Sequence, residues 1–360
     1  MKGKNPRIMV SGFYGAGNSG DEAMLRNIYF HIKQRLPKAE LIISTEKIKG
    51  LWHPGDLHYV SAMDRGQVRR CDLLMIGGGG LGLGFGWNLT SFAKATSGTP
   101  MPVITLGCSF PPPEYSIPAI KNAVIEMFNL YDLISVRDQS SFDLLNKLGI
   151  KDINLGTDLA IDLPEKKPIR NECPDEYIVV VIREYGAEPR KLMLQKLGHW
   201  IIRSLKHNLK NKTNIVLLPF CKEDYNFTRT IDIGDYPILR TFDPQEHKFI
   251  INRAKAVVSL GRYHPHVYAT EQAVPSIGLS WPVGGSKIDH WMQYWGNGEY
   301  CINEIGETKT NGYEDRCRIL VEKLDGLLDN PTSYRERILK LHAEHVRINN
   351  KQFDDLVGLL

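Results

Sequence analysis

The chain lacks several features that would assign it to a specialised class of protein. No run of about 18 apolar residues occurs, so the sequence predicts no membrane span. The six cysteines are scattered and form no CxxC pair, which argues against a zinc knuckle and a disulfide-stapled secreted domain. Neither sign of charge dominates, because 45 Lys and Arg stand against 41 Asp and Glu, and the composition therefore gives no indication of a nucleic acid partner.

The remaining composition is that of an ordinary globular protein. Hydrophobic residues make up 42% and charged residues 24%, which excludes disorder, collagen and coiled coil. Cys71 and Cys108 lie in apolar, strand-like contexts that are typical of buried, inert thiols. The apolar part of the N-terminus is too short for a signal peptide and leads directly into a strand. We therefore expect a cytoplasmic protein.

The length of 360 residues predicts two domains, because single hydrophobic cores stop growing near ~250–300 residues. Apolar runs without polar alternation are separated by helical segments, which predicts α/β domains with parallel sheets covered on both faces. A polar, proline-containing stretch at 158–170 marks the expected boundary. We expect an N-terminal α/β domain at 1–165, a C-terminal α/β domain at 166–330 and a helical tail at 331–360. Such domains bind ligands outside the carboxyl ends of their strands, in the crevice between the halves.

The hydrophobic pattern predicts individual elements. The expected strands are 8–11, 41–44, 73–76, 103–106, 133–136, 177–182, 215–218, 256–260 and 276–279. The expected helices begin at Asp21 and at Pro265 and cover 120–130, 140–148, 190–209, 245–254 and most of 313–360, with an interruption at Asn330 and Pro331.

A glycine-rich turn joins the first strand to the first helix. Glycines permit close backbone approach, and a helix N-terminus offers N–H groups and a positive dipole end, so the turn is similar to a phosphate cradle. Its spacing is neither GxGxxG nor a P-loop, and Asp21 and Glu22 would oppose a phosphate. A hydroxyl-rich sugar suits Asn18, Asp21 and Glu22 better. The alternative is a tight turn whose acidic residues only cap the helix.

A second glycine-rich segment begins at residues 77–80, directly after an apolar strand. Its seven glycines in ten residues indicate a backbone that is pressed against something. Glycine identifies close approach but not the partner, so a ligand and a crossing segment of chain are both open.

Arg262 and His264 follow another buried strand, and Pro265 suits the first position of a new helix. A guanidinium, an imidazole and free backbone donors at one strand end are suited to binding a carboxylate or a phosphate. We interpret His264 as functional and His266, which falls inside the helix, as structural. No further Cys/His cluster completes a metal site with this pair.

Arg137 ends a fourth strand and is followed by Asp138. Its functional interpretation is a second cation facing the same crevice, and its structural interpretation is a local Arg–Asp pair or a helix cap. Arg183 is the analogous residue in the second half and a weaker candidate.

Taken in order, these motifs resemble those of the polysaccharide pyruvyl transferase family. The motifs are GFYGAGNSGDEAML, GGGG after an apolar strand, ISVRDQSS with LLNKLGI, TDLAI, and GRYHPHVYATEQAVPSIGLSW with Lys287 beyond it. The resemblance covers most of residues 8–290. The chain departs from the family pattern at Pro265, where a small residue is more usual, and at residues 81–84, which lengthen the glycine loop.

Membership would imply two Rossmann-like domains in a glycosyltransferase-B-like fold with a helical C-terminal tail. It would also imply transfer of pyruvate from phosphoenolpyruvate to a sugar of a cell-surface polysaccharide or its precursor, with release of phosphate and closure of a ketal. The residues expected to bind phosphoenolpyruvate are Arg262, His264, Arg137 and Lys287, with His264 and Arg262 as the catalytic pair. The residues expected on the acceptor side are Tyr14, Gly15, Asn18, Asp21, Glu22, Gly78 and Gly79.

In this hypothesis His264 is a general acid, because an imidazole titrates near neutral pH. Asp21 or Glu22 would orient or deprotonate the sugar hydroxyl. The sequence requires no metal or redox cofactor.

Two alternatives stay open: a glycosyltransferase that uses a nucleotide-sugar donor, and a non-catalytic sugar- or anion-binding protein. The acceptor sugar, its lipid or nucleotide carrier and the oligomeric state are also open. Amphipathic stretches of the tail would suit peripheral membrane association, but their mixed charge favours packing within the protein.

Overall fold

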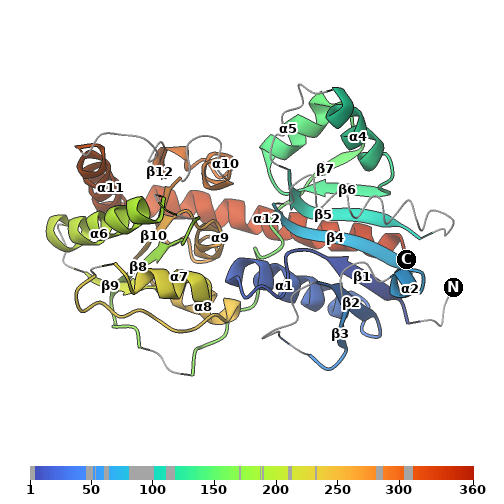
Figure 1. The fold of residues 1–360 in the computed structure, drawn as a ribbon, viewed down its shortest axis with the longest axis horizontal. Helices are drawn as coiled ribbons and strands as arrows, with labels where there is room; N and C mark the ends of the chain where they lie inside the picture. Colours follow the sequence, from blue (N-terminus) through green and yellow to red (C-terminus); the bar gives the residue numbers. More distant parts are fainter. Residues whose placement is uncertain are drawn as a thin grey trace. The chain divides into compact units, whose positions relative to one another are not determined.

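The computed structural model describes residues 5–45, 52, 54–60, 65–80, 101–110, 118–169, 172–186, 188, 190–209, 213–231, 233–280, 287–303 and 311–360. The chain forms two compact units, each with its own sheet and helices (Figure 1). Unit 1 comprises Met1–Leu163 and His345–Leu360, and unit 2 comprises Pro164–Glu344. The units part within the stretch 158–170 that the sequence marks as a boundary.

Unit 1 is built on a parallel sheet whose described strands run in the order β3-β2-β1-β4-β5-β6-β7. The strands are β1 (Arg7–Ser11), β2 (Glu40–Ser44), β3 (Leu57–Val60), β4 (Leu73–Gly80), β5 (Val103–Ser109), β6 (Leu133–Val136) and β7 (Ile153–Leu155). The helices are α1 (Ser19–Arg35), α2 (Arg65–Val68), α4 (Pro118–Phe128) and α5 (Gln139–Lys147). The central strands are buried along nearly their whole length, which explains why they show no polar alternation.

Unit 2 repeats this plan around a parallel sheet whose described strands run in the order β12-β11-β10-β8-β9. The strands are β8 (Tyr177–Ile182), β9 (Asn214–Leu217), β10 (Ala256–Leu260), β11 (Ser276–Leu279) and β12 (Cys301–Ile302). The helices are α6 (Arg190–Asn208), α7 (Lys222–Thr228), α8 (Pro244–Ile251), α9 (His264–Ala269), α10 (Lys287–Tyr294) and α11 (Asn311–Asp329). The first three strands, β8 to β10, lie side by side in the order β10-β8-β9, so their carboxyl ends are neighbours.

The C-terminal residues form α12 (Thr332–Gly358), which is separated from α11 at the predicted interruption. Sequence reasoning treats 331–360 as a tail beside two domains. In the structure this helix is shared, because its residues up to Glu344 cluster with unit 2 and those from His345 cluster with unit 1.

The fold class, two α/β units with parallel sheets, agrees with the prediction, and all the strands and helices expected from the sequence are present. The elements without a sequence prediction are short: β3, α2, β7, α7, α10 and β12. The six cysteines are free, and Cys71 and Cys108 are buried as expected. None of the described helices is long and apolar enough to cross a membrane.

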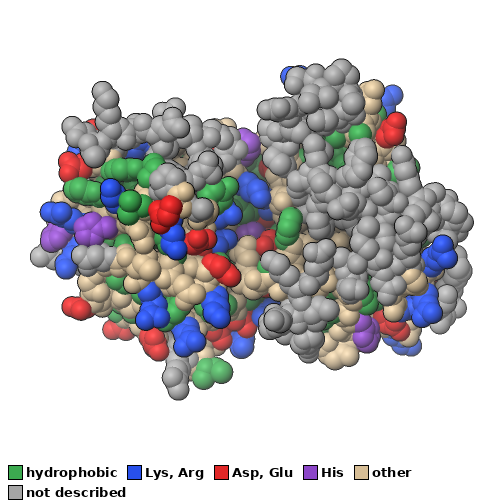
Figure 2. All heavy atoms as spheres, in the orientation of Figure 1, with side chains coloured by type: hydrophobic (Ala, Val, Ile, Leu, Met, Phe, Trp, Pro, Cys, Tyr) green, Lys and Arg blue, Asp and Glu red, His purple; other side chains and the backbone are tan. Residues whose placement is uncertain are grey.

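On the face of the protein that Figure 2 shows, the described surface of unit 2 carries charges of both signs. Lys and Arg side chains are interspersed there with Asp and Glu. This face shows no broad patch of one sign among its described residues, so the cations at the strand ends are considered individually below.

Candidate functional site

In unit 1, the two glycine-rich segments meet around Tyr14. The Tyr14 side chain is buried, and its hydroxyl donates a hydrogen bond to the carbonyl oxygen of Gly77 in β4. Burial holds the pKa of Tyr14 well above its ordinary value, so the hydroxyl donates as a neutral phenol. A Cβ atom at Gly12 would lie 2.5 Å from the Tyr14 ring, so the turn after β1 needs glycine at that position to hold Tyr14. Tyr14 thus fixes the glycine turn after β1 and is not exposed at the surface.

Helix α1 explains the close approach at the end of β4. Gly78 and Gly79 have φ angles of 68° and 87°, which favour glycine. A Cβ atom at Gly78 would lie 2.6 Å from Sδ of Met24, and one at Gly79 would lie 3.8 Å from Oδ1 of Asp21. Of the two readings that glycine leaves open, the described residues show a crossing segment of chain. Residues 81–84 lie outside the described residues.

Glu22 binds the backbone donors that the glycine turn offers. Its Oε1 accepts hydrogen bonds from the N–H groups of Gly15, at 2.7 Å, and Gly17, at 3.4 Å. Only 8% of the side chain is exposed, and burial raises its pKa although these two hydrogen bonds oppose the shift. An internal carboxylate therefore fills the cradle that the sequence pattern suggests for an external anion.

Asn18 and Asp21 lie at the N-terminus of α1. Asn18 caps the helix by accepting a hydrogen bond from the Gly20 N–H at 3.3 Å, and its Nδ2 donates to Oδ2 of Asp21 at 2.6 Å. Asp21 is half-buried, whereas Glu22 is buried. Of the two acidic residues, Asp21 is therefore the more accessible one.

Arg137 lies in the interior of unit 1. Its side chain is 2% exposed, and its Nη1 donates to Oδ2 of Asp158 at 2.8 Å. Asp158 is fully buried and also accepts a hydrogen bond from the Ala160 N–H at 2.9 Å. Asp138 caps α5 by accepting from the Ser141 N–H at 2.8 Å. The close partner of the guanidinium is thus the distant Asp158 and not the neighbouring Asp138, whose carboxylate lies 3.9 Å away. These contacts place Arg137 in the interior of unit 1.

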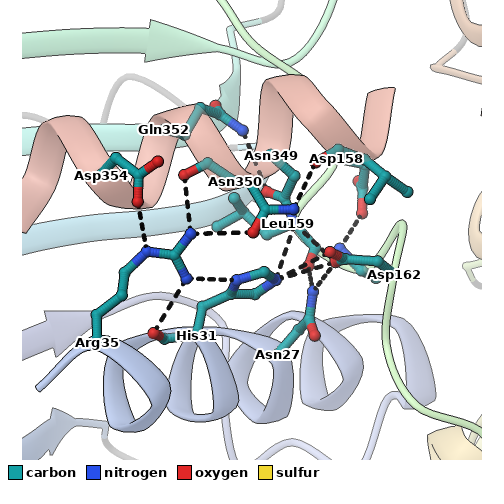
Figure 3. A network of polar contacts seen from close by, with 12 residues as sticks. Asn27, His31, Arg35, Asp158, Leu159, Asp162, Asn349, Asn350, Gln352 and Asp354 are labelled. Atoms are coloured by element: carbon teal, nitrogen blue, oxygen red, sulfur yellow. Dashed lines mark hydrogen bonds and ion pairs between the residues drawn. The ribbon is translucent and has the colours of Figure 1, made fainter. Parts of the chain in front are cut away.

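The segment that contains Asp158 is joined to α1 and α12 by a polar network (Figure 3). Asp162 accepts hydrogen bonds from Asn27 at 2.6 Å, from Nε2 of His31 at 3.0 Å and from Asn349 at 2.8 Å. Nη1 of Arg35 lies 3.1 Å from Nδ1 of His31, so the ring connects this arginine to Asp162. The network anchors the last turns of α12 to unit 1.

In unit 2, Arg262 extends from the loop after β10 and makes a bidentate contact with Asp224. Its Nε donates to Oδ2 and its Nη2 donates to Oδ1, both at 2.7 Å. The Nη2 group also lies 3.1 Å from Sγ of Cys221, the N-cap of α7. Sequence reasoning identifies Arg262 but misses Asp224 and Cys221, because the short α7 has no long apolar repeat that would reveal it.

His264 is the first residue of α9, and Pro265 occupies the first turn as predicted. The His264 side chain is 9% exposed, and its ring meets the Tyr263 ring edge-on at a centroid distance of 5.0 Å. His266 is fully buried, and its Nδ1 lies 3.2 Å from Oγ of Ser276. Burial lowers the pKa of His266 to about 3, which agrees with its structural interpretation.

The other two candidate cations of unit 2, Lys287 and Arg183, differ in their surroundings. Lys287 is the first residue of α10 and is exposed. Arg183 follows β8, its guanidinium lies 4.8 Å from the centre of the Tyr185 ring, and its Nη1 donates to the carbonyl oxygen of Gly261 at 3.4 Å. The structure thus brings Arg183 and Arg262 to neighbouring strand ends of unit 2, whereas Arg137 belongs to unit 1.

Solved structures of similar fold cover nearly the whole chain at low sequence identity. A putative UDP-N-acetylglucosamine 2-epimerase from Listeria monocytogenes has a TM-score of 0.61 at 10% identity, over 93% of this chain and 91% of that one. The glycotransferase of kitacinnamycin has a TM-score of 0.60 at 12% identity, over 99% and 100%. UGT71G1 of Medicago truncatula, solved with UDP-glucose, has a TM-score of 0.60 at 11% identity, over 98% of both chains. At this identity the likeness shows the fold alone, which is glycosyltransferase-B-like.

No curated protein sequence matches this chain. The family model for polysaccharide pyruvyl transferase matches residues 18–282, a span that begins at the cap of α1 and includes the loop of Arg262 and His264. This match covers well over half of the chain and agrees with the order of the motifs in the sequence. The chain therefore belongs to the polysaccharide pyruvyl transferase family, and it is a transferase.

Proposed function

We propose that this protein transfers pyruvate from phosphoenolpyruvate to a sugar of a cell-surface polysaccharide or its precursor. The observation that carries the proposal is the Arg262–His264 pair at the carboxyl end of β10, inside the span that the family model matches. In parallel α/β sheets this edge is where ligands bind. The six free cysteines support a reducing compartment, the cytoplasm, as the place of this reaction.

Phosphoenolpyruvate carries a carboxylate and a phosphate and needs more than one cationic anchor. Arg262 is held by Asp224, and its planar guanidinium is suited to a carboxylate or phosphate. Lys287 is exposed at the start of α10 in the same unit and supplies a second, compact positive charge. Arg137 is buried against Asp158, so we assign it a structural role in the interior of unit 1 and no direct contact with the donor.

In the proposed reaction His264 donates a proton to the methylene carbon of phosphoenolpyruvate, which turns it into the methyl group of the ketal. One sugar hydroxyl bonds to the central carbon, and the bond from that carbon to the phosphate oxygen breaks as inorganic phosphate leaves. A second hydroxyl of the same sugar then completes the ketal. The two hydroxyl protons balance the proton given by His264 and the one that leaves with phosphate. Asp21 is the candidate base for the attacking hydroxyl, since Glu22 already binds the turn.

The test is release of phosphate from phosphoenolpyruvate by the full chain, screened against a panel of sugars, nucleotide sugars and lipid-linked sugars. We expect His264→Ala to abolish release in the presence of an acceptor while the far-ultraviolet circular dichroism spectrum is preserved. The matched control is His207→Ala, which removes an exposed histidine at the end of α6 in the same unit. Turnover by His264→Ala at the rate of the control would contradict the role of His264.

A second candidate is a glycosyltransferase with a nucleotide-sugar donor. It is favoured by the fold, since the similar structures include one solved with UDP-glucose. Thermal unfolding in the presence of each compound separates the two. Stabilisation by phosphoenolpyruvate and not by a panel of UDP-sugars supports pyruvyl transfer, and the reverse result supports the glycosyltransferase. Stabilisation without any release of phosphate or nucleotide would instead indicate a binding protein.

A further inference from the structure

Asp224 is a fully buried carboxylate that accepts four hydrogen bonds. Two come from Nε and Nη2 of Arg262, both at 2.7 Å. The other two come from backbone N–H groups, that of Glu184 at 2.9 Å and that of Phe220 at 3.3 Å. A carboxylate has about four lone-pair positions, so the bonding capacity of Asp224 is filled.

The four donors come from three adjacent strand ends. Glu184 follows β8, Phe220 follows β9 and Arg262 follows β10, and the sheet order places β8 between the other two. Asp224 itself is in the first turn of α7. One side chain therefore joins the loops that form the ligand-binding edge of unit 2.

We propose that Asp224 is a positioning residue for Arg262, which it holds in the orientation that binds the anionic donor. A guanidinium is planar and rigid, so a bidentate contact through Nε and Nη2 also fixes the direction of Nη1. A salt bridge whose carboxylate is 0% exposed and whose guanidinium is 13% exposed is screened little by solvent. The inference rests on the proposed function, because the anion in question is phosphoenolpyruvate.

Pre-orientation has a consequence for binding that simple attraction does not. Asp224 neutralises the charge of Arg262, so a purely electrostatic view predicts that removing the carboxylate strengthens anion binding. A positioning role predicts the opposite, because a long side chain without its partner must be ordered again when the ligand binds. The sign of the change therefore separates the two roles.

The first experiment is a double-mutant cycle on binding of phosphoenolpyruvate by isothermal titration calorimetry. The variants are Asp224→Asn, Arg262→Lys and the double variant, and the control is Glu165→Gln, which removes another carboxylate that pairs with an arginine, Arg253, in unit 2. We expect Asp224→Asn to weaken binding about twofold to tenfold, which corresponds to the cost of ordering one long side chain when the ligand binds. The double variant should bind no more weakly than Arg262→Lys, because Asp224 acts through Arg262.

Unchanged or tighter binding by Asp224→Asn would overturn the inference and leave the proposed function standing. Equal, additive losses from the two single variants would also overturn it, since they would show that Asp224 acts independently of Arg262. Absence of phosphoenolpyruvate binding by the wild-type protein would contradict the proposed function itself.

A second measurement needs neither a ligand nor a folded Asp224 variant. Arginine Nε–H resonances report hydrogen exchange with water, and loss of one resonance in Arg262→Lys assigns that of Arg262. We expect the Nε–H of Arg262 in the wild-type protein to exchange at least tenfold more slowly than that of an exposed arginine such as Arg70. The reason is that this N–H group donates a hydrogen bond to the buried carboxylate of Asp224. Exchange as fast as that of Arg70 would show that Asp224 does not hold the guanidinium and would overturn the inference.

Discussion

Replacing Arg137 by Met separates its two interpretations. The guanidinium lies 2.8 Å from Asp158, and the two side chains are 2% and 0% exposed. Removing one partner of such a pair leaves a buried charge uncompensated, which destabilises a protein by about 3–5 kcal/mol. For a unit of this size, about 2–4 °C per kcal/mol converts this loss into a fall of roughly 6–20 °C in the melting temperature. We therefore expect Arg137→Met to be a stability variant.

The assay is differential scanning calorimetry of the full chain, with the double variant Arg137→Met, Asp158→Asn as the control. Asparagine keeps the acceptor for the Ala160 N–H, so the double variant removes both charges while leaving that hydrogen bond in place. We expect it to be less destabilised than the sum of the two single changes, by about 0.5–3 kcal/mol. If Arg137→Met has the melting temperature of the wild type but no longer binds phosphoenolpyruvate, Arg137 contacts the donor, and its purely structural role is refuted.

Two further predictions concern buried titratable groups. Burial raises the pKa of Glu22 above the ordinary 4.5, so its ionisation destabilises the fold as pH rises through the raised value. The melting temperature of Glu22→Gln minus that of the wild type should therefore increase with pH from about 4.5 upward, and a difference independent of pH would contradict this. His266 stays neutral in the fold down to a pKa of about 3, so the wild type should lose up to about 1.4 kcal/mol per pH unit below 6.5 through this group. His266→Gln should show a smaller loss in urea titrations at pH 6.5 and 5, whereas the exposed control His207→Gln should not.

Much of the fold is encoded locally and could be predicted. The buried strands β4 and β8 are continuous apolar runs, and helix α1 begins at an Asn cap followed by acidic residues, as local signals require. The interruption at Asn330 and Pro331 follows from the lack of a backbone donor at proline. The short elements are not predictable in this way, because four residues of β3 or seven of α7 carry too little periodicity.

The candidate site was predictable only in part, for a physical reason. The type and strand-end position of Arg262 are visible in the sequence, but its partner Asp224 lies 38 residues earlier and meets it only once β9 and β10 are placed. Likewise, glycine at 78 indicates close approach, but only the packing of α1 identifies Met24 as what approaches. A sequence pattern indicates the type of contact that a residue can make, whereas long-range packing determines which residue is its partner.

The glycine turn of unit 1 and the Arg262 loop of unit 2 are each held by a buried carboxylate. In unit 1 Glu22 binds backbone N–H groups of the glycine turn, and in unit 2 Asp224 binds two loop N–H groups together with Arg262. Each buried carboxylate orders a strand-end loop before any ligand arrives. The loops are ordered as each unit folds, and the packing of the whole unit stabilises them. Their groups therefore need no reorientation during a reaction. The expectation that follows is that Glu22 and Asp224 variants differ from the wild type more in turnover and ligand affinity than in secondary structure.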